Sequence, residues 1–261
     1  MYVPRFVKSA LVPMYREFKN DVAFRRSFEG FPPPLDRIMR RVSRTRFSCS
    51  DEHNIPGWLT ANERRALYAL ARWAPGPILE IGSWVGLSTT AIARGIKDSG
   101  VNKAFDTIDL NPTIEWFRPC ADGTIGFYLP NQSEPFGKCS EDEFKKSIAP
   151  IVSIPGGPVT LLRKHLTRCG LDNLVSIHVG DFRNLPPRRY RFVFCDALHD
   201  QNEITHNAAE LDRFLAPGSV LACHDIGRNP EYITALRGVV TLGHGISIDS
   251  LYIVEVTAES C

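Results

Sequence analysis

The sequence predicts an α/β fold built on a doubly wound, mostly parallel sheet. Two observations carry this prediction. From Thr60 onward, short apolar runs of strand length alternate with amphipathic helical segments, and glycine-rich or polar turns separate them. The chain has 261 residues, of which 43% are hydrophobic and 23% charged, so it is long enough and apolar enough for one large domain with an appendage.

The predicted elements follow one another in a regular order. The first is a helix that opens with a capping box at Thr60 and Glu63 and ends near Pro75. Strands are expected at residues 77–82, 104–109, 174–179, 190–195, 219–223 and 251–256. Helices are expected at residues 86–97, 159–170 and 203–215. A turn is expected around His244, between Gly243 and Gly245, before the last strand.

Two stretches fall outside this alternation. Residues 1–57 are interrupted by prolines, and residues 1–50 contain eleven Lys or Arg against four Asp or Glu. We expect them to form a basic helical extension with a solvated face; contact with a membrane surface or another subunit is the alternative. Residues 112–157 are rich in Pro, Gly and aromatic residues, with a short helix expected at 142–148. Such long insertions often cover a binding site, so we expect a substrate lid, with an oligomer contact or a plain insertion as alternatives.

Charge and cysteine content exclude several classes of protein. The formal net charge of +2 is too small to indicate nucleic acid as a partner. The seven cysteines include no C-x-x-C pair, which argues against a disulfide framework and a zinc knuckle. No apolar stretch approaches the roughly 18 residues of a membrane span, so we expect no transmembrane segment and a reducing, cytoplasmic location.

The strongest local signal is a glycine-rich turn between a predicted strand and a predicted helix. Its candidate ligand-binding residues are Glu80, Gly82, Ser83, Trp84, Gly86 and Ser88. A dinucleotide site would have the pattern G-x-G-x-x-G, whereas this turn has an acid two residues before the first glycine and then G-x-x-x-G. An acid at that position suits a cationic ligand. The alternative is that Glu80 only ties the turn down.

Two further acids follow later strands. Asp109 ends the second strand, 27 residues after Gly82, where it can accept two hydrogen bonds from ribose hydroxyls. Capping of the turn at Asn111 is the alternative role of Asp109. After the third strand, Asp181 stands beside Phe182, and this pair can bind an adenine amino group and pack against its ring, although Gly-Asp is also a common turn.

In this order, the three motifs resemble those of class I S-adenosylmethionine-dependent methyltransferases, which have a Rossmann-like fold. The match extends from about residue 75 to residue 256 and implies a methyltransferase domain over residues 58–261. The resemblance implies that S-adenosylmethionine is the cofactor. By this resemblance, the methionine moiety is lined by Gly82, Ser83 and Trp84, the ribose is bound by Asp109, and the adenine by Asp181 and Phe182.

Acids and imidazoles gather after the fourth and fifth strands. Asp196 and His199 follow the fourth, and His224 and Asp225 follow the fifth. These D-x-x-H and H-D motifs resemble a bacterial branch related to small-molecule and sugar O-methyltransferases. Because the ends of neighbouring parallel strands meet at one crevice, the four side chains are expected to converge there, and Asp196 is also expected to contact the cofactor.

Two catalytic hypotheses remain open for this cluster. Asp196, His224 and Asp225 are candidate ligands of Mg²⁺ or Mn²⁺, which would acidify a substrate hydroxyl. Alternatively, His199, beside Asp196, is a general base, since its ordinary pKa of about 6.5 suits proton removal at neutral pH. Some metal-dependent relatives carry two adjacent acids where this chain has a histidine and an aspartate.

The expected activity is transfer of a methyl group to a small-molecule acceptor, at a hydroxyl oxygen. One alternative is a methyltransferase that acts on a peptide or protein. An NAD(P)-dependent oxidoreductase is less favoured, because Trp84 or Val85 stands where that site needs a glycine. A non-catalytic cofactor-binding protein is less favoured because the acid and histidine positions are intact. Homo-oligomers through the N-terminal region or the insertion are further expectations.

Overall fold

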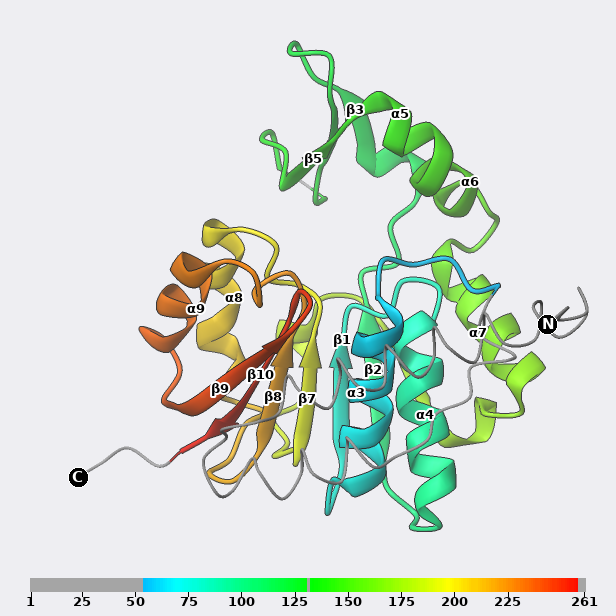
Figure 1. Cartoon of the computed structure of the whole chain (residues 1–261). Helices are drawn as coiled ribbons and strands as arrows, with labels where there is room; N and C mark the ends of the chain where they lie inside the picture. Colours follow the sequence, from blue (N-terminus) through cyan, green and yellow to red (C-terminus); the bar gives the residue numbers. More distant parts are fainter. Residues whose placement is uncertain (1–53, 131, 258–261) are drawn as a thin grey trace, which may run out of the picture.

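The computed structural model of the protein describes residues 54–130 and 132–257 (Figure 1). Its centre is a seven-stranded sheet with the order β6-β2-β1-β7-β8-β10-β9. The first five strands are parallel, and β10 and β9 are antiparallel additions at one edge. The strands are β1 (Ile78–Ile81), β2 (Phe105–Asp109), β6 (Ser176–Val179), β7 (Phe192–Cys195), β8 (Val220–Cys223), β9 (Leu242–Ile248) and β10 (Leu251–Val256). The predicted mostly parallel α/β fold is therefore confirmed.

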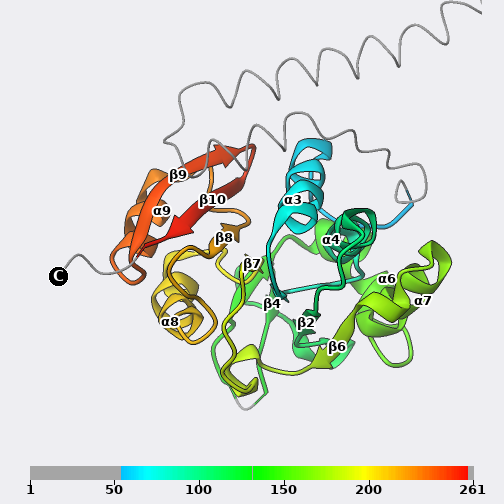
Figure 2. The same ribbon diagram turned by 90° about the horizontal axis from the view of Figure 1, so that it is seen from below.

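Helices cover both faces of this sheet, as the view from below shows (Figure 2). One face packs against α3 (Ala61–Trp73), α4 (Leu87–Ser99) and α7 (Pro158–Cys169), and the other against α8 (Gln201–Leu211) and α9 (Pro230–Arg237). Strands β1, β7 and β8 are buried along their whole length, which explains why each is a continuous apolar run with little alternation. Helix α3 begins with the predicted capping box at Thr60.

The insertion after β2 has a small fold of its own. Strands β3 (Phe117–Pro119), β4 (Ile125–Phe127) and β5 (Gly137–Cys139) form an antiparallel sheet, preceded by the 3₁₀ turn η1 (Ile114–Trp116). The predicted short helix at 142–148 is confirmed by α5 (Glu141–Glu143) and the π-helix η2 (Phe144–Ile148), after which comes α6 (Ala149–Val152). Figure 1 shows this unit beyond the carboxyl ends of the parallel strands.

Two features differ from the sequence prediction. Helix α9 and strand β9 were not expected, and the predicted turn around His244 is wrong because these residues lie in β9. Gly245 pairs with Val254, and a Cβ there would lie 2.2 Å from the hydroxyl oxygen of Tyr252. The glycine therefore marks the close approach of a side chain rather than a turn.

Two expectations concern the rest of the chain. Most of the predicted basic extension, residues 1–57, lies outside the described residues. The remaining short elements are the 3₁₀ turns η3 (Asp172–Leu174) and η4 (Phe182–Asn184). Within residues 54–130 and 132–257, none of the helices combines the length and the apolar character of a membrane span.

Candidate active site

The glycine-rich turn lies between β1 and α4, against the end of β7. Gly82, Trp84 and Gly86 have φ angles of 87°, 47° and 97°, so the chain reverses tightly within a few residues. A Cβ at Gly82 would lie 2.5 Å from the backbone oxygen of Asp196, which leaves room only for glycine. The turn therefore presses directly against the first residue after β7.

Asp109 holds this turn in place. Its Oδ2 accepts the backbone N–H groups of Ser83 at 3.0 Å and Trp84 at 2.8 Å, and its Oδ1 accepts the N–H of Asn111 at 2.7 Å. Burial raises the pKa of Asp109, while these three backbone donors lower it. A carboxylate offers about four acceptor positions, so roughly one remains, on Oδ1.

Several polar atoms of the turn are buried without a hydrogen-bond partner. Among the described residues, Oε1 of Glu80, Oγ of Ser83 and Nε1 of Trp84 are in this position. The other carboxylate oxygen of Glu80 accepts the hydroxyls of Thr89 and Thr107, both at 2.6 Å. Burial raises the pKa of Glu80 to about 7. Since buried polar atoms normally have partners, this turn suits a ligand that brings polar groups of its own.

The start of α4 belongs to the same turn. Gly86 is the residue before the helix and supplies no side-chain cap, so the first helical N–H groups are not satisfied by it. Ser88 is buried in the first turn of α4. His165 of α7 also contacts the turn, because its Nδ1 lies 2.7 Å from the backbone oxygen of Val85.

Asp181 and Phe182 lie at the end of β6, where the sequence places them. Arg183 donates to the Asp181 carboxylate through its backbone N–H and its guanidinium, and these bonds lower the pKa of Asp181 against the raising effect of burial. The ring of Phe182 is buried and packs against Phe214, with centroids 6.4 Å apart. The ring therefore belongs to the core, and its expected contact with adenine stays a prediction.

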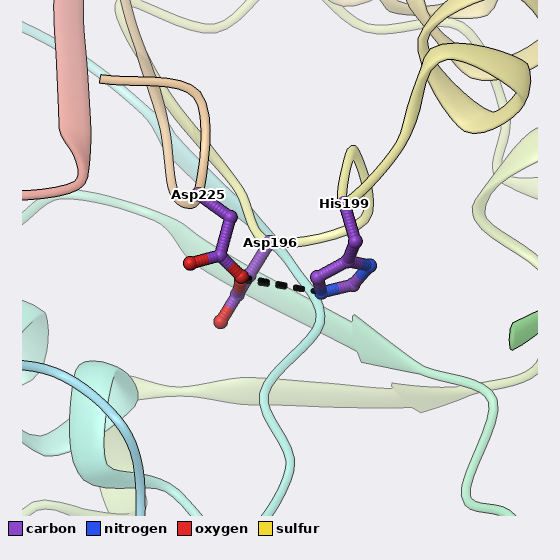
Figure 3. Close-up of side chains that lie close together, drawn as sticks. All are labelled: Asp196, His199 and Asp225. Carbon is purple, nitrogen blue, oxygen red and sulfur yellow. Dashed lines mark ion pairs between the residues drawn. The ribbon is translucent and has the colours of Figure 1, made fainter. Parts of the chain in front are cut away.

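Asp196, His199 and Asp225 form a cluster at the ends of β7 and β8 (Figure 3). One nitrogen or oxygen atom of each lies within 4.8 Å of the others. His199 Nε2 is 3.7 Å from Asp196 Oδ1 and 4.0 Å from Asp225 Oδ2. Carboxylates and a neutral imidazole are ligands that Mn²⁺ accepts, and carboxylates also suit Mg²⁺, so the donor set fits a divalent cation.

His224 does not join this cluster. It is buried, its Nδ1 lies 3.1 Å from Asp196 Oδ1 and 3.4 Å from Asp225 Oδ1, and its Nε2 lies 3.1 Å from Ser250 Oγ and 3.6 Å from Glu63 Oε2. Burial would lower its pKa, but Asp196, Asp225 and Glu63 raise it to about 12. Both ring nitrogens of His224 are engaged by protein groups, so the three-residue cluster contains His199 in its place, and the expectation that His224 ligates a metal stays a prediction.

Two glutamates outside the sequence prediction complete the site. Glu203 of α8 accepts the backbone N–H and Nδ1 of His199 through one oxygen, at 2.6 and 2.8 Å. The spacing of four residues between His199 and Glu203, at the start of a helix, is the sequence feature that could have indicated this contact. Glu63 is the third helical residue of α3 and closes the capping box with Thr60, and the same carboxylate also faces His224 and accepts the N–H and hydroxyl of Ser250. Because the capping motif already accounts for Glu63, no sequence feature indicated its contacts with His224 and Ser250.

Carboxylates and imidazoles alternate through the cluster and its neighbours. Burial would raise the pKa of Asp196, but hydrogen bonds from His199 and His224 hold it well below its ordinary value. Burial would lower the pKa of His199, but Asp196 and Glu203 raise it well above 6.5. Carboxylates and imidazoles therefore stabilise one another from Glu63 through His224, Asp196 and His199 to Glu203.

Comparison with known proteins identifies the family. The model of a family described as "Methyltransferase domain" matches residues 79–226, which is more than half of the chain. This segment includes the glycine-rich turn, Asp109 and the Asp196–His199–Asp225 cluster. A search of curated proteins gave no match.

Solved structures of similar fold include three methyltransferases. An O-methyltransferase from Bacillus cereus, in complex with S-adenosylhomocysteine, is 16% identical, with 88% of this chain and 94% of that chain covered and a TM-score of 0.48. The O-methyltransferase TomG from Streptomyces achromogenes, in complex with S-adenosylmethionine, is 17% identical, with coverages of 92% and 96% and a TM-score of 0.49. A methyltransferase from Geobacter sulfurreducens is 18% identical, with coverages of 88% and 93% and a TM-score of 0.49.

The family match confirms the methyltransferase family that the order of the sequence motifs resembles. The chain belongs to the methyltransferase-domain family and is a class I S-adenosylmethionine-dependent methyltransferase.

Proposed function

We propose that this enzyme transfers the methyl group of S-adenosylmethionine to a hydroxyl oxygen of a small-molecule acceptor, at the cluster of Asp196, His199 and Asp225. The observation that carries the proposal is the position of this cluster beside the glycine-rich turn. A Cβ at Gly82 would lie 3.2 Å from the Cβ of Asp196, so the turn and the cluster are in direct contact. A methyl donor held by the turn would lie next to groups that can accept a proton.

The residues proposed to hold the cofactor surround that turn. Its polar atoms without partners, on Glu80, Ser83 and Trp84, suit a ligand with its own donors and acceptors, and Asp109 retains about one acceptor position for a ribose hydroxyl. Asp181, which follows the edge strand β6, is the proposed partner of the adenine amino group, and Phe182 lies next to it. Bound S-adenosylmethionine supplies a methyl group that its sulfonium charge already activates.

A hydroxyl acceptor is favoured by the chemistry of the cluster. The methyl donor is activated, so the protein must position the acceptor and remove its proton. A hydroxyl needs this assistance more than a neutral amine, which attacks through its free electron pair. Asp196, His199 and Asp225 would hold a Mg²⁺ or Mn²⁺ ion, whose charge would lower the pKa of the acceptor hydroxyl.

His199 as a general base is the alternative within the same site. Its Nδ1 faces Glu203 at 2.8 Å, which leaves Nε2 directed toward Asp196 and Asp225. This is the orientation that either a metal ligand or a base at that position requires. The two versions therefore differ in whether an ion lies among the three side chains, and a chelator distinguishes them.

The insertion is proposed to cover the acceptor. It lies beyond the carboxyl ends of the parallel strands (Figure 1), and the cluster follows the carboxyl ends of β7 and β8. Its interior is aromatic: the rings of Phe117 and Phe127 are 5.2 Å apart, and Trp116 stacks on Phe127 at 5.9 Å. This internal packing gives the small sheet a shape of its own, so that it can act as a preformed cover for a small molecule.

The test combines cofactor binding with an acceptor screen. Calorimetry with S-adenosylhomocysteine should show binding to the wild type, and Asp109→Ala should weaken it, because the ribose would lose its acceptor. Transfer of labelled methyl should then be measured on catechols, sugars, amines and a peptide mixture, each with EDTA or with Mn²⁺. Labelling of hydroxyl compounds is expected. Labelling of peptides or amines alone, or binding of NAD in place of S-adenosylhomocysteine, would overturn the proposal.

A further inference from the structure

The two ends of the insertion meet at one side chain, that of Asn111. Asn111 follows Asp109 by two residues, and its φ of 55° lies in the left-handed region, which asparagine tolerates better than most residues. Its Oδ1 accepts the backbone N–H of Val159 at 2.9 Å, and its Nδ2 donates to the backbone oxygen of Gly156 at 3.1 Å. These partners are 48 and 45 residues away along the chain, so one carboxamide joins both stems of the insertion.

The surroundings of this carboxamide leave little room for another side chain. A Cβ at Gly157 would lie 2.5 Å from Oδ1 of Asn111, and Gly157 itself has a φ of 73°. Val159 is in the first turn of α7, so Oδ1 satisfies one of the N–H groups that every helix start leaves without a partner. Since both the acceptor and the donor of the carboxamide are used, aspartate could replace only one of these two functions.

Asn111 is also bonded to the proposed ribose-binding residue. Its backbone N–H donates to Oδ1 of Asp109 at 2.7 Å, whereas Oδ2 of Asp109 already accepts the N–H groups of Ser83 and Trp84. The acceptor position that remains on Asp109 is therefore on Oδ1, beside Asn111. A ribose hydroxyl bound to Asp109 would share this oxygen with Asn111.

We propose that Asn111 is a positioning residue that couples cofactor binding at Asp109 to the orientation of the insertion, residues 112–157. This inference rests on the proposed function, in which Asp109 binds the ribose. A hydroxyl on Oδ1 fixes the carboxylate to which the Asn111 backbone is bonded, and the Asn111 carboxamide in turn holds both stems. The cover of the acceptor site is ordered once the cofactor is in place.

Hydrogen–deuterium exchange with and without S-adenosylhomocysteine tests this coupling without an acceptor. In the wild type, S-adenosylhomocysteine should slow exchange in the turn at residues 80–90 and also in the insertion. Asn111→Gly removes the carboxamide and keeps the left-handed backbone accessible. In this variant the slowing in the insertion should be lost, while the slowing at residues 80–90 and the calorimetric affinity for S-adenosylhomocysteine remain. Asn111→Asp, which keeps the acceptor and loses the donor, should lose part of the effect.

The comparison separates coupling from a merely structural role. A structural defect would speed exchange of the insertion in the free protein, but it would not remove the change caused by S-adenosylhomocysteine. Lys146→Ala is the control, because it removes only an exposed ion pair with Asp142 within the insertion. Equal slowing of the insertion in the wild type and Asn111→Gly, or none in the wild type, would overturn the coupling while cofactor binding stands. Failure of the wild type to bind S-adenosylhomocysteine would overturn the proposed function itself.

Discussion

Glu203 binds His199 twice with a single carboxylate oxygen. Oε2 accepts the backbone N–H of His199 at 2.6 Å and faces its Nδ1 at 2.8 Å, and the Glu203 side chain is buried, with 6% of its surface exposed. A carboxylate in this place favours the tautomer with the proton on Nδ1. Nε2 is then the nitrogen that faces Asp196 and Asp225, where a metal ligand or a base is needed.

Glu203→Gln should therefore weaken the site without removing any group that faces the acceptor. A neutral amide orients the imidazole less firmly and makes its Nε2 a poorer donor to a metal. Loss of such a supporting group typically costs about 10- to 100-fold in metal affinity or activity. Titration with Mn²⁺, followed by electron paramagnetic resonance, measures the affinity. Glu210→Gln on the same helix is the control, since Glu210 forms a partly exposed ion pair with Arg213 and does not contact His199 among the described residues. Equal affinities for both variants would contradict this role of Glu203.

The metal set itself makes a second prediction. His199→Ala and Asp225→Asn should each abolish Mn²⁺ binding, whereas His224→Gln, in protein shown to be folded, should reduce it far less. The reason is that both nitrogens of His224 already face protein groups, Nδ1 toward Asp196 and Asp225 and Nε2 toward Glu63 and Ser250. If His224→Gln lost Mn²⁺ as completely as His199→Ala, the sequence-based ligand set would be correct after all. Activity that resists EDTA but is lost in His199→Ala would favour the base.

The choice between His224 and His199 shows what the sequence leaves open. The pattern placed all four side chains at the ends of β7 and β8, and the structure agrees. It does not tell which member of the adjacent pair, His224 or Asp225, joins the cluster, because the pair follows the end of β8 and Asp225 has a left-handed φ of 61°, which the strand pattern does not predict. That choice depends on α3, because its Glu63 lies 3.6 Å from His224 Nε2 in the interior, although the two residues are 161 positions apart in the sequence.

The same contrast holds for the fold. Strands β1, β7 and β8 were predictable because each is a continuous apolar run. Helix α4 was predictable because its apolar residues recur at helical spacing over its length. The three strands of the insertion were not, because each has three residues and β3 is largely exposed, which leaves no period to detect. Their stability comes from ring contacts among aromatic residues that are distant along the chain.

The burial of Glu63 makes a prediction about acid stability. Burial would raise its pKa, but bonds from His224, Ser250 and Thr60 lower it from 4.5 to about 2. A carboxyl whose pKa is lower in the folded protein stabilises it above the unfolded value and loses this effect as pH falls through the folded value. The free energy of unfolding of the wild type should therefore exceed that of Glu63→Gln above pH 4.5, and the difference should shrink toward pH 2. A difference that does not change with pH would contradict this assignment.

Gly82 offers a test of the contact between the glycine-rich turn and the cluster. Gly82 has a φ of 87°, and a Cβ there would lie 2.5 Å from the backbone oxygen of Asp196. Backbone atoms cannot move aside as the end of a flexible side chain can. Gly82→Ala must therefore separate the turn from the end of β7, and with it displace Ser83 and Trp84 from Asp109.

Gly100→Ala is the matched control, because it separates backbone strain from this collision. Gly100 has a similar φ of 67°, but a Cβ there would have nothing within 4 Å. Both substitutions place alanine in the left-handed region, at a cost of roughly 1–2 kcal/mol. Only Gly82→Ala should also lose affinity for S-adenosylhomocysteine and for Mn²⁺, measured by calorimetry on folded protein. If Gly82→Ala bound S-adenosylhomocysteine and Mn²⁺ as tightly as Gly100→Ala does, the turn and the metal cluster would be independent of each other. Their contact would then not explain why the methyl donor lies beside the groups that accept the proton.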